Sequence, residues 1–374
     1  MRKISPKILT RGSEIMNNVI SLNDVLNKFN IESHIEDYGN GHINDTYLTD
    51  TEQYILQRIN TTIFKNPKEL MENIEHVTAF LTEKIKANGG DPKRETLSVI
   101  KTDDGQNYYM ADEDNVFRVY RYITDTVSID EDKSPEVLYN TGAGFGKFQK
   151  MLSDFPADTL FETIKNFHDT PLRIEALKEA VKNDLAGRAA SVQKEIDFAL
   201  SRAHEMGAVV DGIADGSIPL RVTHNDTKIN NILFDKNTLE AVCVIDLDTV
   251  MPGSALYDFG DALRYGASTA AEDETDLDKV TFSIEAFESF AKGFLEQTGD
   301  SLTEREVQLL AFSAKLMTYE CGIRFLTDYL NGDTYFKIHR ENHNLDRARN
   351  HIKLIEDIES KMDQLNDIIN NLMK

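Results

Sequence analysis

The chain has only two cysteines among its 374 residues, and this scarcity excludes two kinds of site. Cys243 and Cys321 are too few for a disulfide framework or for a zinc site made of thiolates. One stands in an apolar segment of strand type and the other in an apolar segment of helix type. We therefore expect two buried, reduced thiols.

Long hydrophobic runs are also missing. No apolar stretch reaches the length that a membrane-spanning helix requires. The first residues, "MRKISPKILTRGSEIM", carry positive charge but lack the uninterrupted apolar stretch of a signal peptide. We expect a soluble, cytoplasmic protein with no membrane partner.

Basic residues are in short supply, with 41 Lys and Arg against 64 Asp and Glu, for a formal net charge of −23. This charge repels the phosphates of nucleic acids and anionic membrane surfaces, so no nucleic-acid partner is expected. The expected partners are small or cationic molecules. An anionic ligand such as a nucleotide would need a local group of Lys or Arg side chains and a divalent metal.

The length exceeds that of a single core and predicts two lobes of an α+β protein. Residues 1–122 hold short strands and one helix, which begins at Asn66–Pro67 and places apolar residues on one face. Residues 123–374 are mainly helical, with "YITDTVSIDEDKSP" as the boundary region. The expected helices of the second lobe are 136–153, 171–207, 255–266, 281–297, 303–330 and 344–372.

A β-hairpin interrupts these helices. The runs "NILFD" and "LEAVCVID" have strand length and are joined by "DKNT", which has turn composition. Antiparallel pairing brings Asn231, before the first strand, and Asp246, after the second, to the same end of the hairpin. An amide oxygen and a carboxylate, with positions left for phosphate oxygens and water, suit Mg²⁺. Asp248 could complete or support this metal site.

The segment "HNDTKINN" precedes the hairpin and has the Asp-x-x-x-x-Asn spacing of a kinase catalytic loop. Asp226 would accept the proton of an attacking hydroxyl, and Lys228 would neutralise charge on the transferred phosphoryl group. His224 is expected to brace the loop through hydrogen bonds, because phosphoryl transfer depends on positioning more than on strong basicity.

Simpler interpretations exist for each of these residues, because Asp-rich turns beside hairpins are usually solvated. The order of base, lysine, metal amide, hairpin and metal carboxylate favours a functional site. Farther along, "MPGSALYDFGDALRYG" begins a helix with Asp258 and Asp261 in its first turns, which suits the helix dipole whatever the function. Asp258 could also hold the catalytic loop by accepting backbone hydrogen bonds.

Two features of the first lobe could bind phosphates. In "YGNGHINDTY", Gly39 and Gly41 permit a tight turn whose N–H groups could cover phosphates, although the third glycine of protein kinases is replaced by Asn44. In "YILQRIN", Arg58 could meet the α- and β-phosphates, steadied by Glu72 or Glu75. A plain hairpin turn and an exposed strand arginine are the alternatives.

In this order, the motifs resemble the aminoglycoside phosphotransferase and choline kinase superfamily, small-molecule kinases with a two-lobed, protein-kinase-like fold. Within it, the chain looks most like the bacterial N-acetylhexosamine 1-kinases. The stretches that carry this resemblance are "THNDTKINNILFD", "VIDLDTVMPGSALYDFGDALRYGA", "YILQRIN" and "ECGIRFLTDYLNGDTYF", within residues 38–361.

The resemblance implies transfer of phosphate from ATP, with Mg²⁺, to the anomeric hydroxyl of N-acetylglucosamine or N-acetylgalactosamine. It makes Asp226 the base, and Asn231 and Asp246 the Mg²⁺ ligands. It also implies that His42, Arg324 and Tyr335 face the sugar, and that the hinge receiving adenine is formed by Tyr120, Arg121, Tyr122 and Ile123.

Alternatives remain for the three sugar-facing residues and for the function. Arg324 could pair with Asp328 at i,i+4 on a helix surface, Tyr335 could be a half-buried aromatic, and a histidine in a turn is common. The acceptor could be an aminoglycoside, choline, homoserine or another small alcohol, or the protein could be a regulator that binds nucleotide without transferring phosphate. A glycosidase using Asp246 and Asp248 would leave Lys228 and Asn231 without a role. The preferred hexosamine, the nucleotide and the oligomeric state are left open.

Overall fold

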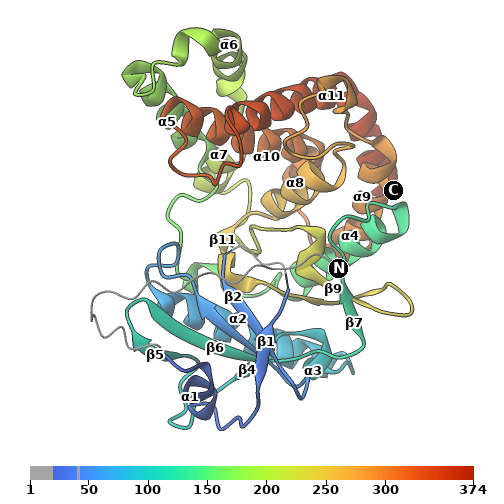
Figure 1. Cartoon of the computed structure of the whole chain (residues 1–374). Coiled ribbons are helices and arrows are strands. Elements are labelled where there is room, and N and C mark those ends of the chain that lie inside the picture. Colours follow the sequence, from blue (N-terminus) through green and yellow to red (C-terminus); the bar gives the residue numbers. More distant parts are fainter. Residues whose placement is uncertain (1–19, 40–42) are drawn as a thin grey trace, which may run out of the picture.

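The computed structural model describes residues 20–39 and 43–374. These residues form two lobes, with a sheet-containing small lobe below a larger helical lobe in Figure 1. The sheet has the strand order β1-β2-β3-β6-β4, and β5 also pairs with β6. The elements of the small lobe are α1 (Leu22–Asn27), β1 (Ile35–Asp37), β2 (Asp45–Thr49), β3 (Tyr54–Ile59), α2 (Pro67–Ala87), α3 (Pro92–Glu95), β4 (Val99–Ile100), β5 (Tyr109–Asp112) and β6 (Asn115–Arg121).

Helix α2 forms as the sequence predicts. The Asn66 side chain accepts a hydrogen bond from the Glu69 N–H, and Pro67 occupies the first turn, where a missing N–H costs nothing. The predicted apolar face is buried and comprises Leu70, Ile74, Val77 and Leu81. This face packs against the sheet and against the large lobe.

The sheet is covered on both faces. On one face, Leu56 of β3 and Phe117 and Val119 of β6 pack with α1. On the other face, Ile59 of β3 and Val116 of β6 join the core that contains α2. Because side chains alternate along a strand, neighbouring residues of β3 and β6 point to opposite faces. This alternation decides which of their charged side chains face α1 and which face the core that contains α2.

The predicted hairpin is present as β9 (Ile232–Asp235) and β10 (Ala241–Val244), which pair antiparallel. A third strand, β7 (Thr126–Ser128), pairs with the other edge of β9. Only four residues separate the end of β6 from the start of β7. The connection between the sheet of the small lobe and the sheet that contains the hairpin is therefore short. Close beside the hairpin, β8 (Arg221–Thr223) pairs with β11 (Met251–Gly253).

The helices of the large lobe surround one apolar core. They are α4 (Pro135–Met151), α5 (Thr170–Asn183), α6 (Gln193–Arg202), α7 (Ala208–Asp215), α8 (Ala255–Gly266), α9 (Ile284–Thr298), α10 (Glu304–Leu330) and α11 (His343–Leu372). Helices α4 and α9 approach so closely that a Cβ at Gly142 or Gly293 would clash with the backbone of the facing helix. Glycine is therefore required at these two positions.

The single helix predicted over 171–207 is wrong. The chain turns out of α5 at Asp184, whose φ of 39° is left-handed, and again at Gly187, with φ of 68°. The Asp184 side chain accepts hydrogen bonds from the N–H groups of Arg188 and Ala189, which stabilises the turn. Local polar bonding thus overrides the helical periodicity.

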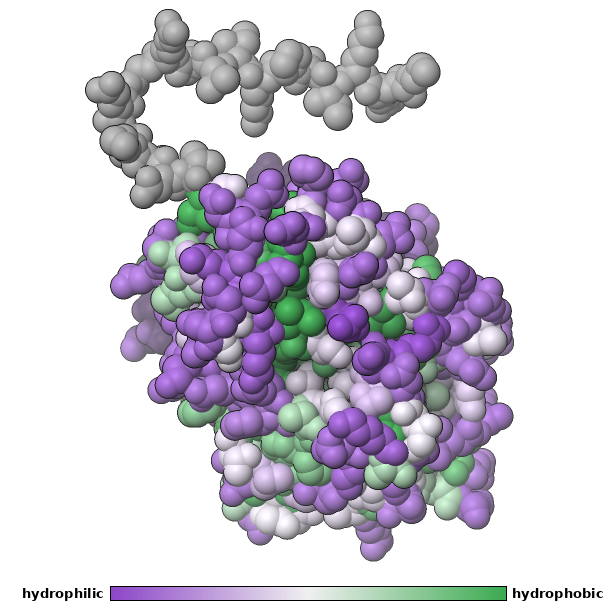
Figure 2. Space-filling view, turned by 90° about the horizontal axis from the view of Figure 1, so that it is seen from below, coloured by the Kyte–Doolittle hydropathy of each residue, from purple (hydrophilic) through white to green (hydrophobic). Residues whose placement is uncertain are grey.

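The surface seen from the small-lobe end is largely hydrophilic, as the net charge of −23 suggests, and a narrow strip of hydrophobic residues runs across it (Figure 2). Among the residues that the structure describes, no helix combines the length and apolar character needed to cross a bilayer. Of the two free thiols, Cys243 is buried but Cys321 is partly exposed, so the expectation of two buried thiols holds for one.

Candidate active site

The catalytic loop joins β8 to β9, and the start of helix α8 holds it in place. Asp258 in the first turn of α8 accepts hydrogen bonds from the backbone N–H groups of His224, at 3.0 Å, and Asn225, at 2.8 Å. Gln149 of α4 donates to the same carboxylate at 2.6 Å. The suggestion that Asp258 holds this loop is confirmed. These bonds offset the burial that raises the pKa of Asp258.

His224 lies beneath the loop and braces it. Its Nε2 donates to the Ile245 carbonyl at 2.8 Å, and its Nδ1 accepts from the Asp226 N–H at 3.2 Å. Both bonds suit one neutral tautomer, which leaves neither nitrogen free to take a proton from a substrate. The bracing role predicted for His224 is confirmed, and it ties the loop to the end of β10.

Asp226, Lys228 and Asn231 lie together in the catalytic loop. The Lys228 ammonium is 2.8 Å from one carboxylate oxygen of Asp226, and the Asn231 amide donates to the other at 3.1 Å. Burial would lower the pKa of Lys228, but Asp226 outweighs it and the pKa is raised. Lys228 is therefore a fixed positive charge beside a carboxylate whose orientation is set from two sides.

Asp246 comes to the same end of the hairpin as Asn231, as the topology predicts. The Ile245 N–H donates to the Asn231 carbonyl at 2.9 Å, and Asp246 follows in a left-handed conformation with φ of 58°. Burial, together with Asp248 and Asp226, raises the pKa of Asp246 to about 6. Carboxylates crowded in this way favour a bound cation. The donor set fits Mg²⁺, because the Asn231 nitrogen is used by Asp226 and its amide oxygen remains to bind metal.

Asp248, which was expected to complete or support the metal site, contacts residues of the small lobe. Its carboxylate is buried, with one oxygen bonded to the Arg118 guanidinium and the other accepting from Asn44 at 2.7 Å. Both oxygens are thus engaged by residues of the small lobe. Sequence reasoning missed Arg118, which lies 130 positions away on β6, and it noted Asn44 only as a departure from a glycine pattern.

Arg58 does not reach the cleft, so its predicted role in phosphate binding is not supported. Its side chain is 46% exposed and binds Asp45 on the outer face of the sheet, with the Nε atom at 2.7 Å. The glutamates proposed to steady it are also occupied elsewhere, since Glu72 pairs with Lys68 and Glu75 with Lys101. The residue of β3 that faces inward is Gln57, which accepts two hydrogen bonds from Arg118.

The glycine turn and the hinge meet at one edge of the cleft. Gly39 has a φ of 76°, as a tight turn requires, whereas Gly41 and His42 lie outside the described residues. Tyr38 at the start of the turn packs edge-on against Tyr122, with ring centroids 6.0 Å apart. The predicted hinge residues follow one another here, with Tyr120 and Arg121 ending β6 and Tyr122 and Ile123 in the link to β7.

Arg324 and Tyr335, predicted to face the acceptor, lie near each other. The Arg324 guanidinium is 5.9 Å from the Tyr335 ring centroid and 5.4 Å from that of Phe336. Arg324 has no ion pair among the described residues, and Asp328 is not its partner. Tyr335 is 73% exposed rather than half-buried.

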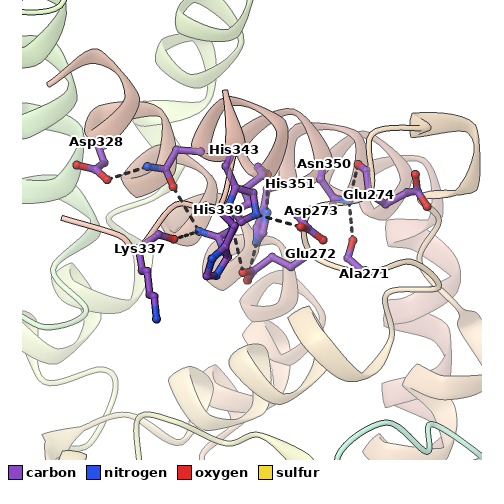
Figure 3. Close-up of polar contacts among 12 residues, drawn as sticks. Ala271, Glu272, Asp273, Glu274, Asp328, Lys337, His339, His343, Asn350 and His351 are labelled. Atoms are coloured by element: carbon purple, nitrogen blue, oxygen red, sulfur yellow. Dashed lines mark hydrogen bonds and ion pairs between the residues drawn. The ribbon is translucent and has the colours of Figure 1, made fainter. Parts of the chain in front are cut away.

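Asp328 has a different role, which sequence reasoning missed. Its carboxylate accepts hydrogen bonds from the N–H groups of Thr334, Tyr335 and Phe336 and from the Asn344 side chain, at 2.8 to 2.9 Å. This network fixes the loop that carries Tyr335. Helix α11 also holds the segment that contains Ala271 and Asp273. The His343 side chain bonds to the Asp273 carboxylate, and the Asn350 side chain donates to the Ala271 backbone oxygen (Figure 3).

A buried charge network lies behind Lys228. Arg264 of α8 bonds to Asp261 at 2.9 Å and to Glu272 at 3.0 Å. Burial would raise the pKa of Asp261, but Arg264 and Lys228 outweigh it and hold the pKa down. Asp261 therefore remains ionised and helps to balance the charge of Lys228.

This arrangement can be compared with known proteins. The family model described as the phosphotransferase enzyme family matches residues 34–299, which is more than half of the chain. The chain belongs to this family. The matched region of the phosphotransferase contains the glycine turn, the catalytic loop, the hairpin and α8, but ends before Arg324 and Tyr335.

Solved structures of small-molecule kinases share the fold. An aminoglycoside phosphotransferase from Alicyclobacillus acidocaldarius matches with a TM-score of 0.66 at 13% identity, over 96% of this chain and 99% of that chain. The GDP complex of aminoglycoside 2'-phosphotransferase-IIIa gives 0.55 at 13%, over 91% and 97%. A choline/ethanolamine kinase family protein from Mesorhizobium loti gives 0.51 at 15%, over 91% and 92%. The predicted two-lobed, kinase-like α+β fold is confirmed.

Proposed function

We propose that this phosphotransferase uses ATP and Mg²⁺ to phosphorylate the anomeric hydroxyl of an N-acetylhexosamine, giving the sugar 1-phosphate. The observation that carries the proposal is the geometry of Asp226, whose carboxylate is oriented by Lys228 and Asn231 beside Asp246. A base, a cation and a pair of metal-binding oxygens at one end of a hairpin are the parts that phosphoryl transfer requires.

In this reaction, each residue of the proposed site has a separate task. Asp226 orients the attacking hydroxyl and accepts its proton late, when the bond to phosphorus is forming. Lys228 lies beside that carboxylate and neutralises charge on the transferred phosphoryl group. Asn231 and Asp246 would hold Mg²⁺, and the ion would supply positive charge beside the phosphates of the nucleotide. The Tyr120–Ile123 segment would receive adenine, and the turn that begins at Gly39 would cover the phosphates.

The acceptor is assigned from the residues on the α10 side of the site. Arg324 is a cation without an ion pair in the described part of the chain, and the rings of Tyr335 and Phe336 lie beside it. A cationic acceptor such as choline or an aminoglycoside would be repelled by this arginine. A neutral sugar can accept hydrogen bonds from it through an acetamido carbonyl and pack its ring on an aromatic face. The "GIRFLTDYLNGDTYF" motif, which resembles that of the N-acetylhexosamine 1-kinases, supports the same choice.

The test is ADP release with Mg²⁺-ATP against N-acetylglucosamine, N-acetylgalactosamine, glucose, galactose, choline, homoserine and kanamycin. We expect turnover with the two N-acetylhexosamines above all others. The matched control is the methyl glycoside of N-acetylglucosamine, which keeps every other hydroxyl but has none at C1. Turnover of this glycoside would show that the anomeric position is not the acceptor, and activity confined to choline or kanamycin would refute the choice of sugar. Activity with none of the panel would favour a nucleotide-binding regulator.

A further inference from the structure

The small lobe presents its inward-facing cation from an unexpected strand. In protein kinases, a lysine on the third strand binds the α- and β-phosphates and is held by a glutamate of the following helix. Here β3 presents Gln57 to the interior while Arg58 binds Asp45 on the outer face. Helix α2 approaches the same region with the Met71 thioether rather than a carboxylate. Neither partner of the kinase ion pair is therefore in its usual place.

Arg118 of β6 stands directly opposite Gln57 in the antiparallel register. It is 1% exposed, and its Nε and Nη2 atoms donate to the Gln57 amide oxygen at 3.0 and 2.8 Å. Its Nη1 atom binds the Asp248 carboxylate, which belongs to the large lobe. Burial would lower the pKa of Arg118, but Asp248 outweighs this effect, and Asp246 also contributes to raising it. A permanent positive charge thus lies next to the carboxylates of the metal site.

A second observation points to a ligand at this place. Tyr120 lies two residues along β6 on the same face, and the Arg118 guanidinium is 5.1 Å from its ring centroid. The Tyr120 hydroxyl is buried and has no hydrogen-bond partner among the described residues. Burial raises the pKa of Tyr120, and Asp248 and Asp246 add to this effect. An unpartnered buried hydroxyl is costly. A bound anionic oxygen would satisfy it.

Asp248 connects these residues to the glycine turn. Its second oxygen accepts from the Asn44 side-chain N–H at 2.7 Å, and the Asn44 side-chain oxygen Oδ1 accepts from the Asn60 backbone N–H at 3.0 Å. The Asp248 carboxylate therefore connects three parts of the chain: the segment that follows β10, strand β6, and the end of the turn that is expected to cover the phosphates. A kinase helix glutamate makes a comparable connection between the lysine and the rest of the site.

We propose that the Arg118–Asp248 pair replaces the third-strand lysine and helix glutamate, with Arg118 supplying the positive charge beside the nucleotide phosphates and the Tyr120 hydroxyl donating to a phosphate oxygen. Arg118 is a positioning residue, because it acts through Asp248 and through its charge. The proposal rests on the use of a nucleotide proposed above. It does not depend on which acceptor the protein phosphorylates.

The test compares the binding of Mg²⁺-ADP and of adenosine to purified protein by calorimetry. The first variant is Gln57→Glu, which keeps the side-chain size and adds a second carboxylate beside Arg118, so that the group of Arg118, Asp248 and residue 57 becomes net negative. We expect the Kd for ADP to rise about tenfold or more, because an uncompensated charge in a poorly solvated site acts strongly on phosphates. The Kd for adenosine should change by less than about twofold, because adenosine has no phosphate. If Arg118 had only a structural role, the variant would weaken the binding of both ligands equally.

Arg58→Gln is the matched control, since it removes the outward-facing cation of the same strand. We expect it to leave the ADP affinity unchanged. An increase in Kd with Arg58→Gln and not with Gln57→Glu would overturn the proposal. Tyr120→Phe should weaken ADP alone, by about threefold to tenfold for one lost hydrogen bond. The double variant Gln57→Lys with Arg118→Gln returns the cation to β3 and should bind ADP more tightly than Arg118→Gln.

The outcomes separate this proposal from the proposed function. If the wild-type protein binds neither ADP nor ATP, both proposals fail together. If it binds ADP with an affinity that Gln57→Glu, Tyr120→Phe and Arg118→Gln all leave unchanged, only the assignment of Arg118 and Tyr120 fails. If it binds ADP as expected but phosphorylates none of the acceptor panel, the acceptor proposal fails and this one stands.

Discussion

Asn231 donates its side-chain amide to Asp226 twice, to the main-chain oxygen at 2.8 Å and to the carboxylate at 3.1 Å. The two residues are five positions apart, and the short turn Ile229–Asn231 brings them together. Because the amide nitrogen is fixed on Asp226, the same contact sets the direction of the base and that of the amide oxygen offered to a metal.

The first prediction concerns the base. Asp226→Asn keeps the size of the side chain but cannot accept the proton of the hydroxyl. We expect kcat to fall by about 10²- to 10⁴-fold, with the KM for both substrates within about threefold of wild type. Steady-state kinetics with the best N-acetylhexosamine measure this, and Mg²⁺-ADP binding serves as the control. A rise in KM with kcat unchanged would make Asp226 a binding residue instead.

The second prediction distinguishes Asp248 from Asp246 by stability without metal. Asp248→Asn leaves the buried Arg118 charge without its carboxylate, so the free energy of unfolding should fall by about 3 kcal/mol. Asp246→Asn removes one of three neighbouring carboxylates and should leave the free energy of unfolding unchanged or raised by up to about 1 kcal/mol. Urea unfolding in a buffer containing a chelator measures both.

The response to added Mg²⁺ is the control for this pair of variants. Wild-type protein with ADP should be stabilised by Mg²⁺, and Asp246→Asn should lose this response. If Asp248→Asn loses the response while its stability without metal is unaltered, Asp248 is a metal ligand after all.

The third prediction concerns the support of the catalytic loop. Asp258→Ala leaves the buried N–H groups of His224 and Asn225 and the Gln149 amide without their acceptor. The free energy of unfolding should fall by about 3 to 5 kcal/mol. Asp276→Ala is the control, because that carboxylate lies at the surface beside Lys279, and its effect should stay below about 0.5 kcal/mol. Equal effects from the two variants would show that Asp258 does not hold the loop.

The fourth prediction concerns pH. Burial lowers the pKa of His351 to about 4, and the charged groups near it are Glu272, Arg264 and Arg347. The unfolded chain binds a proton near pH 6.5 whereas the folded protein does not, so stability is lost as pH falls from 6.5 towards 4. The full contribution is about 3 kcal/mol.

His351→Gln should remove this contribution from the pH dependence. Urea unfolding between pH 7 and pH 4.5 should show a shallower loss of stability for the variant than for the wild type. His204→Gln is the control, because His204 is exposed. Curves for His351→Gln and wild type that run parallel would mean that His351 is protonated in the folded protein.

The catalytic loop and the hairpin could be predicted because their geometry is local. The spacing from His224 to Asn231 lies within eight residues, and a hairpin necessarily places the start of one strand beside the end of the next. Asp258 could be suggested because an acidic residue at a helix start often accepts backbone hydrogen bonds. In each case, a short segment determines the contact.

The contacts of Arg58 and Arg118 could not be predicted in this way. Which face of β3 turns to the cleft depends on what covers the other face, and α1 buries Leu56 on the side of Arg58. Both faces of the sheet are therefore apolar, and the alternation of the sequence does not distinguish them. The bond from Arg118 to Asp248 spans 130 positions and two lobes, so only the folded structure reveals it.

Gln57 and Arg118 stand where protein kinases have a lysine on the third strand, and this difference has a consequence for chemical probes. An ATP analogue that carries an acylating group needs a nucleophile such as a primary amine beside the phosphates, and in protein kinases the third-strand lysine has one there. In this protein, such a reagent would meet a carboxamide and a guanidinium, neither of which is an effective nucleophile at neutral pH. The primary amine of the catalytic loop that could react is that of Lys228, whose ammonium is held by Asp226.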